Sequence, residues 1–151
     1  MTEQIRFEET VSYLLAKVTT AYRNALERHM GAIGLHGGQT FVLLELWNED
    51  GLRQVDIARR LNLSAPTVNK MIKGLIEINL VTRNRFDDDA RSTRIYLTDK
   101  GTDIRADVEL RWVDLEEECL TGLTETERLV LLEVLRKLRN TYTGHEAAEE
   151  D

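Results

Sequence analysis

Residues 59–85 read RRLNLSAPTVNKMIKGLIEINLVTRNR and contain Pro66, the only proline of the chain. Ser64 is a residue type that commonly caps the start of a helix. Pro66 would fall in the first helical turn, where a missing N–H breaks no intrahelical hydrogen bond. Because Pro66 cannot donate, we expect the Ser64 hydroxyl to accept from the N–H of Thr67. The stretch therefore predicts a helix that begins directly after Ser64.

The two sides of this helix differ in polarity when successive residues are placed about 100° apart. One side collects the apolar residues Ala65, Val68, Met71, Ile72, Leu75 and Ile76. The other side collects Pro66, Thr67, Asn69, Lys70, Lys73 and Glu77. We expect the first side to be buried and the second to be open to solvent. Asn79 then stands where a helix end needs a left-handed residue, a conformation that asparagine can adopt.

The residues before Ser64 complete a helix-turn-helix pattern. Its relative positions 1, 5, 9 and 15 are occupied by Gln54, Ala58, Asn62 and Val68. A small residue at the second of these positions lets two helices cross closely, and asparagine at the third can take a positive φ in the tight turn. This arrangement directs the polar face of the second helix outward. There Thr67, Asn69 and Lys70 can reach base edges in a major groove, and Lys73 can reach a phosphate.

Helical periodicity dominates the rest of the chain and frames a hairpin. It predicts a long helix over about residues 5–30 and shorter helices over about 39–47 and 54–61. VTRNRF and RIYLT flank the turn-rich DDDARST, which is the pattern of a β-hairpin with a charged tip. Thr98 can cap a long helix through Cys119, and Thr124 with Glu127 forms a capping box that opens a last helix. The sequence therefore predicts a mainly α fold with a small β-hairpin wing.

Charge is distributed unevenly along a chain whose formal net charge is −7. Residues 52–96 hold nine Lys and Arg against five Asp and Glu, a local charge of +4, which leaves −11 elsewhere. A basic segment in an acidic protein suits a polyanion at one face, while the acidic remainder discourages indiscriminate binding to nucleic acid. A solvated helix surface would carry the same charges, so charge alone does not decide between the two.

Several other classes of protein are disfavoured. A single cysteine cannot form an internal disulfide, and the acidic N-terminus does not resemble a signal peptide, so we expect a cytoplasmic protein. No apolar run approaches the roughly 20 residues that span a bilayer. His29, His36 and His145 are too few and scattered for a metal site, and the acids lie on solvated faces or in the DDD turn. We expect no cofactor, no metal, no membrane partner and no enzymatic activity.

The order of motifs around the hairpin resembles that of the MarR (multiple antibiotic resistance regulator) family. In that family a recognition helix is followed by a GLv.R exit, a D-x-R wing and an LT..G helix start. The corresponding stretches here are residues 79–83, NLVTR, residues 89–91, DAR, and residues 97–101, LTDKG. Asn79 departs from the usual glycine, Ile76 stands where an acid is frequent, and Ala90 replaces a common second arginine. The resemblance extends over nearly the whole chain, because the family also places one long helix before this core and two after it.

The resemblance implies a single domain of residues 1–151, with a winged helix-turn-helix lobe over about 38–97 and dimerisation helices over about 5–30 and 98–143. It implies a homodimeric transcriptional regulator, more commonly a repressor, bound to a pseudo-palindromic operator in double-stranded DNA. The residues expected at the DNA are Gln54, Ser64, Pro66, Thr67, Asn69, Lys70, Lys73, Arg85, Asp89, Arg91 and Arg94. Arg91 would enter the flanking minor groove, oriented by Asp89. A small aromatic or phenolic effector is expected near Tyr13, Lys17, His36 and Trp112.

Two alternatives stay open for the basic lobe. The charged hairpin can serve solubility alone, since short motifs do mislead. A winged helix used only for protein interaction would lack a basic face, whereas we expect Lys70, Lys73, Arg83, Arg85, Arg91 and Arg94 to lie on one side. Cys119 lies on an apolar helical stripe and is expected to be a buried small hydrophobe rather than an oxidant sensor.

Overall fold

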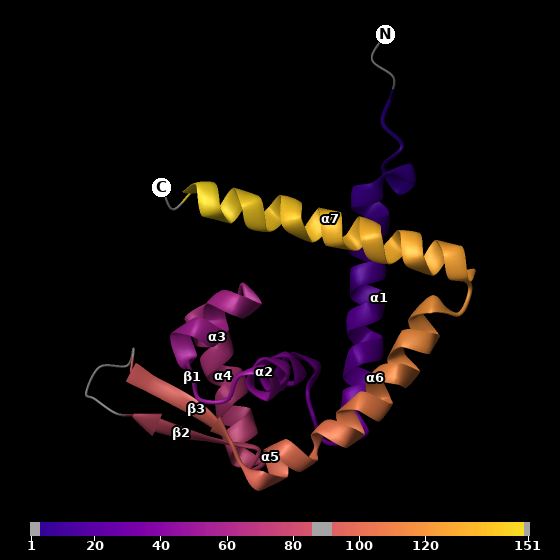
Figure 1. The fold of residues 1–151 in the computed structure, drawn as a ribbon. Helices are drawn as coiled ribbons and strands as arrows, with labels where there is room; N and C mark the ends of the chain where they lie inside the picture. The colour runs from indigo at the N-terminus through magenta and orange to yellow at the C-terminus, as the bar shows by residue number, and fades with distance from the viewer. Residues whose placement is uncertain (1–3, 86–91, 150–151) are drawn as a thin grey trace. The chain divides into compact units, whose positions relative to one another are not determined.

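The computed structural model of the chain describes residues 4–85 and 92–149, with side chains up to residue 143 (Figure 1). Its contacts divide the chain into two compact units, Met1–Leu115 and Glu116–Asp151. The residues after Leu115 contact mainly one another. The single domain expected from the sequence stays a prediction. We describe the two units separately.

The first unit holds most of the helices and strands that the structure describes. They are η1 (Phe7–Glu9), α1 (Val11–Gly31), α2 (Gly37–Asn48), β1 (Leu52–Arg53), α3 (Gln54–Leu61), α4 (Ala65–Glu77), β2 (Val81–Arg85), β3 (Thr93–Leu97), α5 (Asp99–Asp103) and the greater part of α6 (Arg105–Leu120). The helix expected to run on from Thr98 is divided into α5 and α6, with Ile104 between them. The helix-turn-helix and the hairpin are confirmed within a residue or two of the predicted bounds.

A small antiparallel sheet stands beside the helix-turn-helix, in the strand order β1-β3-β2. Strand β2 pairs with β3 so that Arg83 lies opposite Ile95 and Arg85 lies opposite Thr93. Strand β1 adds two residues to the other edge of β3, with Leu52 opposite Ile95. The sequence did not predict β1, because a pair of residues is too short to show a strand period.

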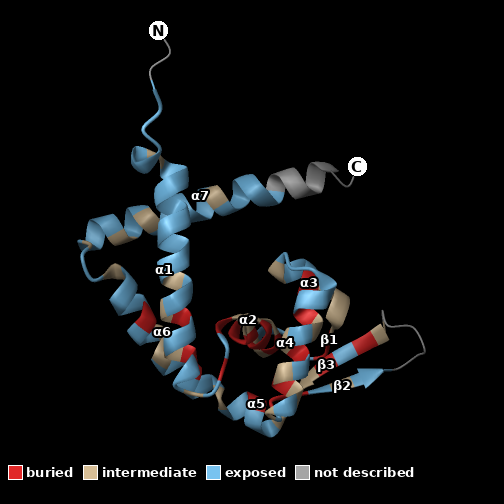
Figure 2. Cartoon of the chain, turned by 180° about the vertical axis from the view of Figure 1, so that it is seen from behind, coloured by how far each residue is buried: buried red, intermediate tan, exposed pale blue. Residues whose placement is uncertain are grey.

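The core of the first unit lies where α2, α3, α4 and the sheet meet, and Figure 2 shows the buried residues gathered there. Helix α4 contributes the face that the sequence predicted, through Val68, Ile72 and Leu75, each 0% exposed. The facing side chains are Val42, Leu43, Leu46, Ile57, Leu80, Val81 and Ile95. This core holds the helix-turn-helix on the sheet, so it fixes the direction in which the opposite face of α4 points.

The junction between the wing and α5 is built around Gly101. Thr98 caps α5, with its Oγ1 accepting from the N–H of Gly101 at 3.0 Å and donating to the carbonyl of Asn79 at 2.6 Å. Asn79 has a φ of 60°, the left-handed conformation expected at the end of α4. A methyl group added at Gly101 would overlap the carbonyl oxygen of Leu80. The glycine of the LT..G motif is therefore required by close approach of two backbone segments.

The second unit consists of the end of α6 and the long helix α7 (Glu125–Glu149). The predicted capping box is confirmed, because Thr124 Oγ1 accepts from the N–H of Glu127 at 3.3 Å and Glu127 Oε2 accepts from the N–H of Thr124 at 2.8 Å. Arg128 links α7 back to α6 by donating to the carbonyl of Leu120 at 3.2 Å. Cys119 is exposed in this chain, so the prediction that it is buried is not met.

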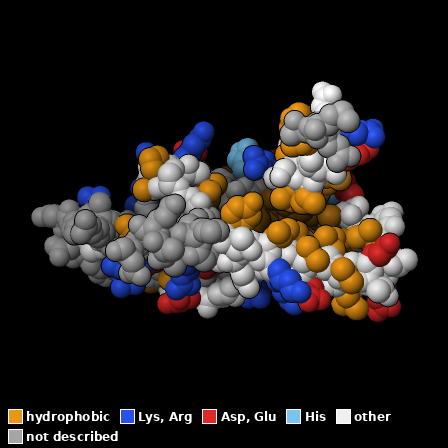
Figure 3. Space-filling view, turned by 90° about the horizontal axis from the view of Figure 1, so that it is seen from above, with side chains coloured by type: hydrophobic (Ala, Val, Ile, Leu, Met, Phe, Trp, Pro, Cys, Tyr) orange, Lys and Arg blue, Asp and Glu red, His pale blue; other side chains and the backbone are white. Residues whose placement is uncertain are grey.

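Large hydrophobic side chains remain exposed in both units. In α1 they include Val11 at 73% and Val18 at 59%, and in α7 they include Leu129 at 64% and Val130 at 53%. Figure 3 shows hydrophobic side chains gathered on the face that it presents.

Across residues 4–85 and 92–149, none of the helices is both long and apolar enough to cross a membrane.

Candidate nucleic-acid interface

The turn between α3 and α4 has the geometry that the sequence predicted. Asn62 takes a φ of 51°, and its N–H and that of Leu63 bond back to the last carbonyls of α3. Ser64 then caps α4, accepting from the N–H of Thr67 at 3.3 Å, with Pro66 in the first turn. The two hydroxyls of Ser64 and Thr67 also lie 2.8 Å apart. The start of α4 therefore presents two small, hydrogen-bonded polar side chains to solvent.

The outward face of α4 carries the exposed residues Pro66, Thr67, Lys70, Lys73 and Glu77. The first four were predicted at the DNA, and the structure brings them together along one side of a single helix. Their exposure follows from the burial of Val68, Ile72 and Leu75 on the other side. Two lysines on an exposed helix face provide cations for phosphates or hydrogen-bond donors for bases.

Asn69 departs from this face, because it is half-buried and turned toward the sheet. Its Oδ1 accepts from Arg83 at 3.0 Å and from Gln54 Nε2 at 3.3 Å. Gln54, which was predicted at the DNA, is thus held against α4 by its own amide. The sequence did not predict this cluster, since the three residues come from α3, α4 and β2 and only the fold brings them together.

The pleat of the sheet separates the arginines of the wing. Arg83 and Arg85 line a cleft with Ala65, Asn69 and Thr93, so both arginines face the helices. Arg94 lies between Thr93 and Ile95 in β3. Because successive side chains of a strand point to opposite faces of the sheet, Arg94 lies on the other face. There it donates to the carbonyl of Gly51 at 2.8 Å. The prediction that these arginines share one side is therefore wrong for Arg94.

Several cations of the basic segment are already paired with acids. Arg53 bonds Asp56 through two nitrogens, at 2.7 and 3.1 Å, and this hydrogen bonding lowers the pKa of the Asp56 carboxyl. Arg60 lies 2.6 Å from Glu49, an acid outside the segment that the charge count covered. These pairs neutralise the charges of Arg53 and Arg60 around α3. The cations exposed on α4 and in the wing therefore carry the electrostatics of this face.

The tip of the wing lies outside the described residues. Asp89 and Arg91, both predicted at the minor groove, fall in the gap between Arg85 and Ser92. Their expected roles stay predictions.

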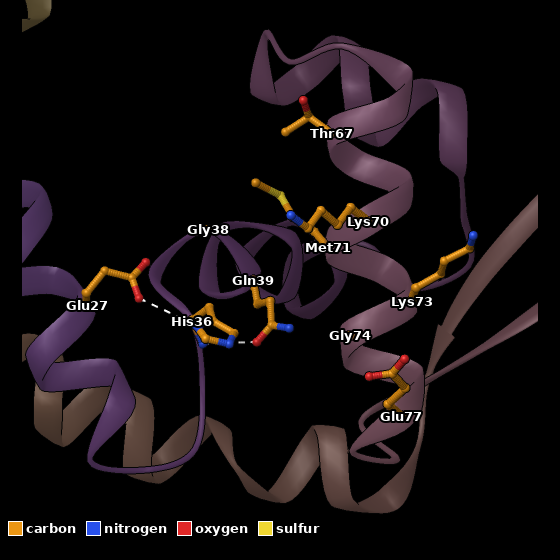
Figure 4. Close-up of a pocket in the computed structure, with 10 residues that line it drawn as sticks. All are labelled: Glu27, His36, Gly38, Gln39, Thr67, Lys70, Met71, Lys73, Gly74 and Glu77. Atoms are coloured by element: carbon orange, nitrogen blue, oxygen red, sulfur yellow. Dashed lines mark hydrogen bonds and ion pairs between the residues drawn. The ribbon is translucent and has the colours of Figure 1, made fainter.

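An open cleft of about 630 Å³ borders the outward face of α4 (Figure 4). Its lining residues come from the end of α1, the start of α2 and α4, and they are Glu27, His36, Gly38, Gln39, Thr67, Lys70, Met71, Lys73, Gly74 and Glu77. Side chains pack directly against two glycines of this cleft, because a methyl group added at Gly74 would overlap the Gln39 amide and one at Gly38 would lie 2.6 Å from Met71 Cε. Glu27 accepts from the N–H of Gly37 at 2.8 Å, which ties α1 to the start of α2.

Comparison with known proteins identifies the lobe that carries these features. A model of the MarR family matches residues 36–93, from the residue that precedes α2 to the first residue of β3. The lobe of residues 36–93 belongs to the MarR family. The match spans the helix-turn-helix and the hairpin, so the family resemblance found in the sequence is confirmed.

Curated relatives of the chain that carries this MarR-family lobe are regulators from bacteria. The HTH-type transcriptional regulator TtmR of Methylorubrum extorquens is 35% identical over 120 residues, covering 80% of this chain and 58% of TtmR. The uncharacterized HTH-type transcriptional regulator YdgJ of Bacillus subtilis is 27% identical over 114 residues, covering 76% of this chain and 70% of YdgJ. The aligned part of this chain therefore spans little more than half the length of TtmR.

Solved structures share the fold of the chain that carries the MarR-family lobe. BpsR of Bordetella bronchiseptica, whose DNA binding is regulated by 6-hydroxynicotinic acid, matches with a TM-score of 0.81 at 21% identity over 91% of this chain and 98% of BpsR. A probable transcriptional regulator from Pseudomonas aeruginosa matches with a TM-score of 0.80 at 20% identity over 88% of this chain and 99% of that one. At these identities the likeness establishes the winged-helix fold.

The four residues expected at an effector site of this protein are not brought together in one chain. His36 lines the cleft beside α4, whereas Trp112 lines a separate cleft of about 310 Å³ between α2 and α6. Tyr13 and Lys17 pair with each other on α1, with Lys17 Nζ 5.4 Å from the centre of the Tyr13 ring. The expected grouping rested on the family resemblance, and within the single chain the helices hold these residues apart.

Proposed function

We propose that this chain is a homodimeric transcriptional repressor that binds a pseudo-palindromic DNA operator in a sequence-specific manner. The observation that carries the proposal is the exposed polar face of α4, with Thr67, Lys70 and Lys73 in line on the second helix of a helix-turn-helix. A helix of this kind enters a major groove, where side chains of its N-terminal half contact bases. Membership of residues 36–93 in the MarR family and the naming of TtmR as a transcriptional regulator add support.

Dimerisation is supported by the apolar surfaces of the long helices. Hydrophobic residues that are half or more exposed recur on α1 and on α7, and α6 adds Leu110 at 63% and Val113 at 61%. Apolar surface of this extent is rarely left in water by a soluble protein. A second copy of the chain is the occupant we propose, because two-fold symmetry would present two α4 helices to one face of a duplex, with half-sites about 10 base pairs apart.

The wing has a separate role in this proposal. Arg85 is exposed on β2 beside the start of α4, in a position to contact a phosphate. Arg91, beyond the described end of β2, is proposed to enter the flanking minor groove, with Asp89 orienting it. A narrow A·T-rich groove has the stronger negative potential, so Arg91 would favour operators with A·T-rich flanks.

Release by a small aromatic or phenolic acid completes the proposed cycle. The cleft beside α4 supports it, because Lys70 supplies a cation at its rim and Met71 supplies an apolar wall. An acid bound there would occupy a lysine that DNA needs, so the two ligands would compete. Regulation of BpsR by 6-hydroxynicotinic acid gives a precedent for this class of ligand among proteins of the same fold.

Selection of bound sequences from a random duplex library tests the central proposal, followed by affinity measurements over a range of salt concentrations. Lys70→Ala and Thr67→Ala should each weaken specific binding by roughly 1–3 kcal/mol and relax the preference at one or two base positions. Lys73→Ala should weaken specific and non-specific binding alike and lower the salt slope by about one unit per half-site. No enriched sequence and no salt dependence would refute DNA binding and favour a protein-interaction module.

A further inference from the structure

The cluster of Gln54, Asn69 and Arg83 fixes the orientation of one side-chain amide on α4. Asn69 Oδ1 accepts from Arg83 at 3.0 Å and from Gln54 at 3.3 Å. A guanidinium group only donates hydrogen bonds, so an amide nitrogen cannot replace the oxygen next to Arg83. The two lone pairs of Oδ1 are then both engaged, and the NH₂ group must point away from Arg83.

This NH₂ group is available for a ligand. Throughout the part of the chain that the structure describes, Asn69 Nδ2 donates no hydrogen bond. Asn69 lies next to Lys70 on α4 and lines a cleft of about 220 Å³ with Gln54, Ala65, Arg83 and Arg85. The cleft opens between α3, the first half of α4 and the wing, which are the elements proposed to approach DNA.

Arg83 is not held in place by optimal bonding of its own. Its Nε is buried and has no hydrogen-bond partner in the described chain, although its NH2 group bonds Asn69. A buried donor without an acceptor costs free energy. The exposed neighbour Arg85, two residues along the same face of β2, is not constrained in this way. The half-buried Arg83 thus uses its one side-chain hydrogen bond among the described residues to orient Asn69.

We infer that Arg83 is a positioning residue that makes Asn69 a pure hydrogen-bond donor and so sets base preference at one position of each half-site. The inference rests on the proposed function. An asparagine that reads adenine by two hydrogen bonds needs a free amide oxygen, which Asn69 lacks. A donor alone selects acceptors on the major-groove edge: N7 and O6 of guanine, N7 of adenine or O4 of thymine. The amino edge of cytosine is rejected.

The sharpest test is Asn69→Asp, because a carboxylate keeps an acceptor toward Arg83 and Gln54 and replaces the outward NH₂ with oxygen. Library selection with the intact chain should move the preference at one position per half-site toward cytosine, whose amino group donates. Affinity should fall for every duplex, because the added charge repels phosphates. The thermal unfolding midpoint should not fall, since both inward hydrogen bonds are retained.

Arg83→Met tests the positioning step, with Arg85→Met as the matched control on the same strand and face. In Arg83→Met the amide is free to rotate, so discrimination at the Asn69 position should fall about tenfold while the salt slope stays unchanged. Arg85→Met should instead lower the salt slope and keep the base preference. Uniform affinity loss with a lower salt slope in Arg83→Met would assign Arg83 to a phosphate and overturn the inference.

The outcomes separate this inference from the proposed function. A wild-type chain that enriches no sequence would refute sequence-specific DNA binding itself. A wild type that enriches an operator, combined with an unchanged base preference in Asn69→Asp, would overturn the reading role of Asn69 alone. If Arg83→Met fails to fold, Asn69→Asp still decides, because that variant keeps the inward contacts.

Discussion

Replacing Gly101 with alanine should destabilise the junction between the wing and α5, because the added methyl group would overlap the carbonyl oxygen of Leu80. That oxygen belongs to the backbone and cannot rotate away, so the two segments must separate. Separation would strain the bond from Trp47 Nε1 to the Gly101 carbonyl, 2.9 Å long, and that from Thr98 N–H to the Leu80 carbonyl, 3.0 Å long. The perturbation therefore acts on packing and on hydrogen bonding together.

The expected magnitude follows from these two effects. Overpacking costs about 1–3 kcal/mol, and weakening one or two neutral hydrogen bonds adds about 0.5–1.5 kcal/mol each. The free energy of unfolding should thus fall by about 1.5–6 kcal/mol. For a chain of this size, a loss of 1 kcal/mol lowers Tm by about 2–4 °C, so we expect Tm to fall by roughly 3–24 °C.

Urea unfolding followed by tryptophan fluorescence measures this loss directly, at one fixed protein concentration. Gly122→Ala is the matched control, because an added methyl group there meets no atom within 4 Å. It should leave the unfolding midpoint near that of wild type. If Gly101→Ala and Gly122→Ala unfold within about 0.5 kcal/mol of each other, the typical range for neutral surface changes, then close backbone approach is not why glycine occupies this position.

Three further substitutions test local features of the lobe. Ser64→Ala should reduce the free energy of unfolding by about 0.5–2 kcal/mol, since the cap of α4 is lost, and an unchanged urea midpoint would exclude capping by the hydroxyl. Asn79→Gly should raise stability by about 0.5–1 kcal/mol over Asn79→Ala, because glycine adopts the observed positive φ without strain, and equal stability of the two variants would contradict this. The hydrogen bond from Arg53 lowers the pKa of the Asp56 carboxyl in the folded protein. The ionised carboxylate therefore stabilises the fold fully above the unfolded-state pKa of about 3.9. This stabilisation is lost as pH falls through the lower folded-state pKa. Asp56→Asn should therefore be slightly less stable than wild type at neutral pH, and the difference should close in acid unfolding titrations below about pH 4; a difference that persists there would assign the effect to packing.

The features that sequence reasoning predicted correctly are governed by local chemistry. The cap at Ser64, the positive φ of Asn62 and Asn79, and the capping box at Thr124 each depend on residues a few positions apart. Such interactions form within one turn of helix or one tight turn, so their residue types show in the sequence. The buried face of α4 was also predictable, because helical geometry alone decides which side chains share a side.

Only the tertiary structure determines which side chains of those elements contact one another. Arg83 reaches Asn69 only because β2 packs beside α4, and the pleat of β3 turns Arg94 away from Arg83. The need for glycine at position 101 follows from the close approach of α5 to the Leu80 carbonyl, which only the fold reveals. The approach of Arg83 to Asn69 and that of Gly101 to Leu80 each join residues separated by more than a dozen positions, and their meeting depends on strand register and helix packing. A sequence pattern reports which face a residue occupies, whereas register and packing determine which atom lies opposite it.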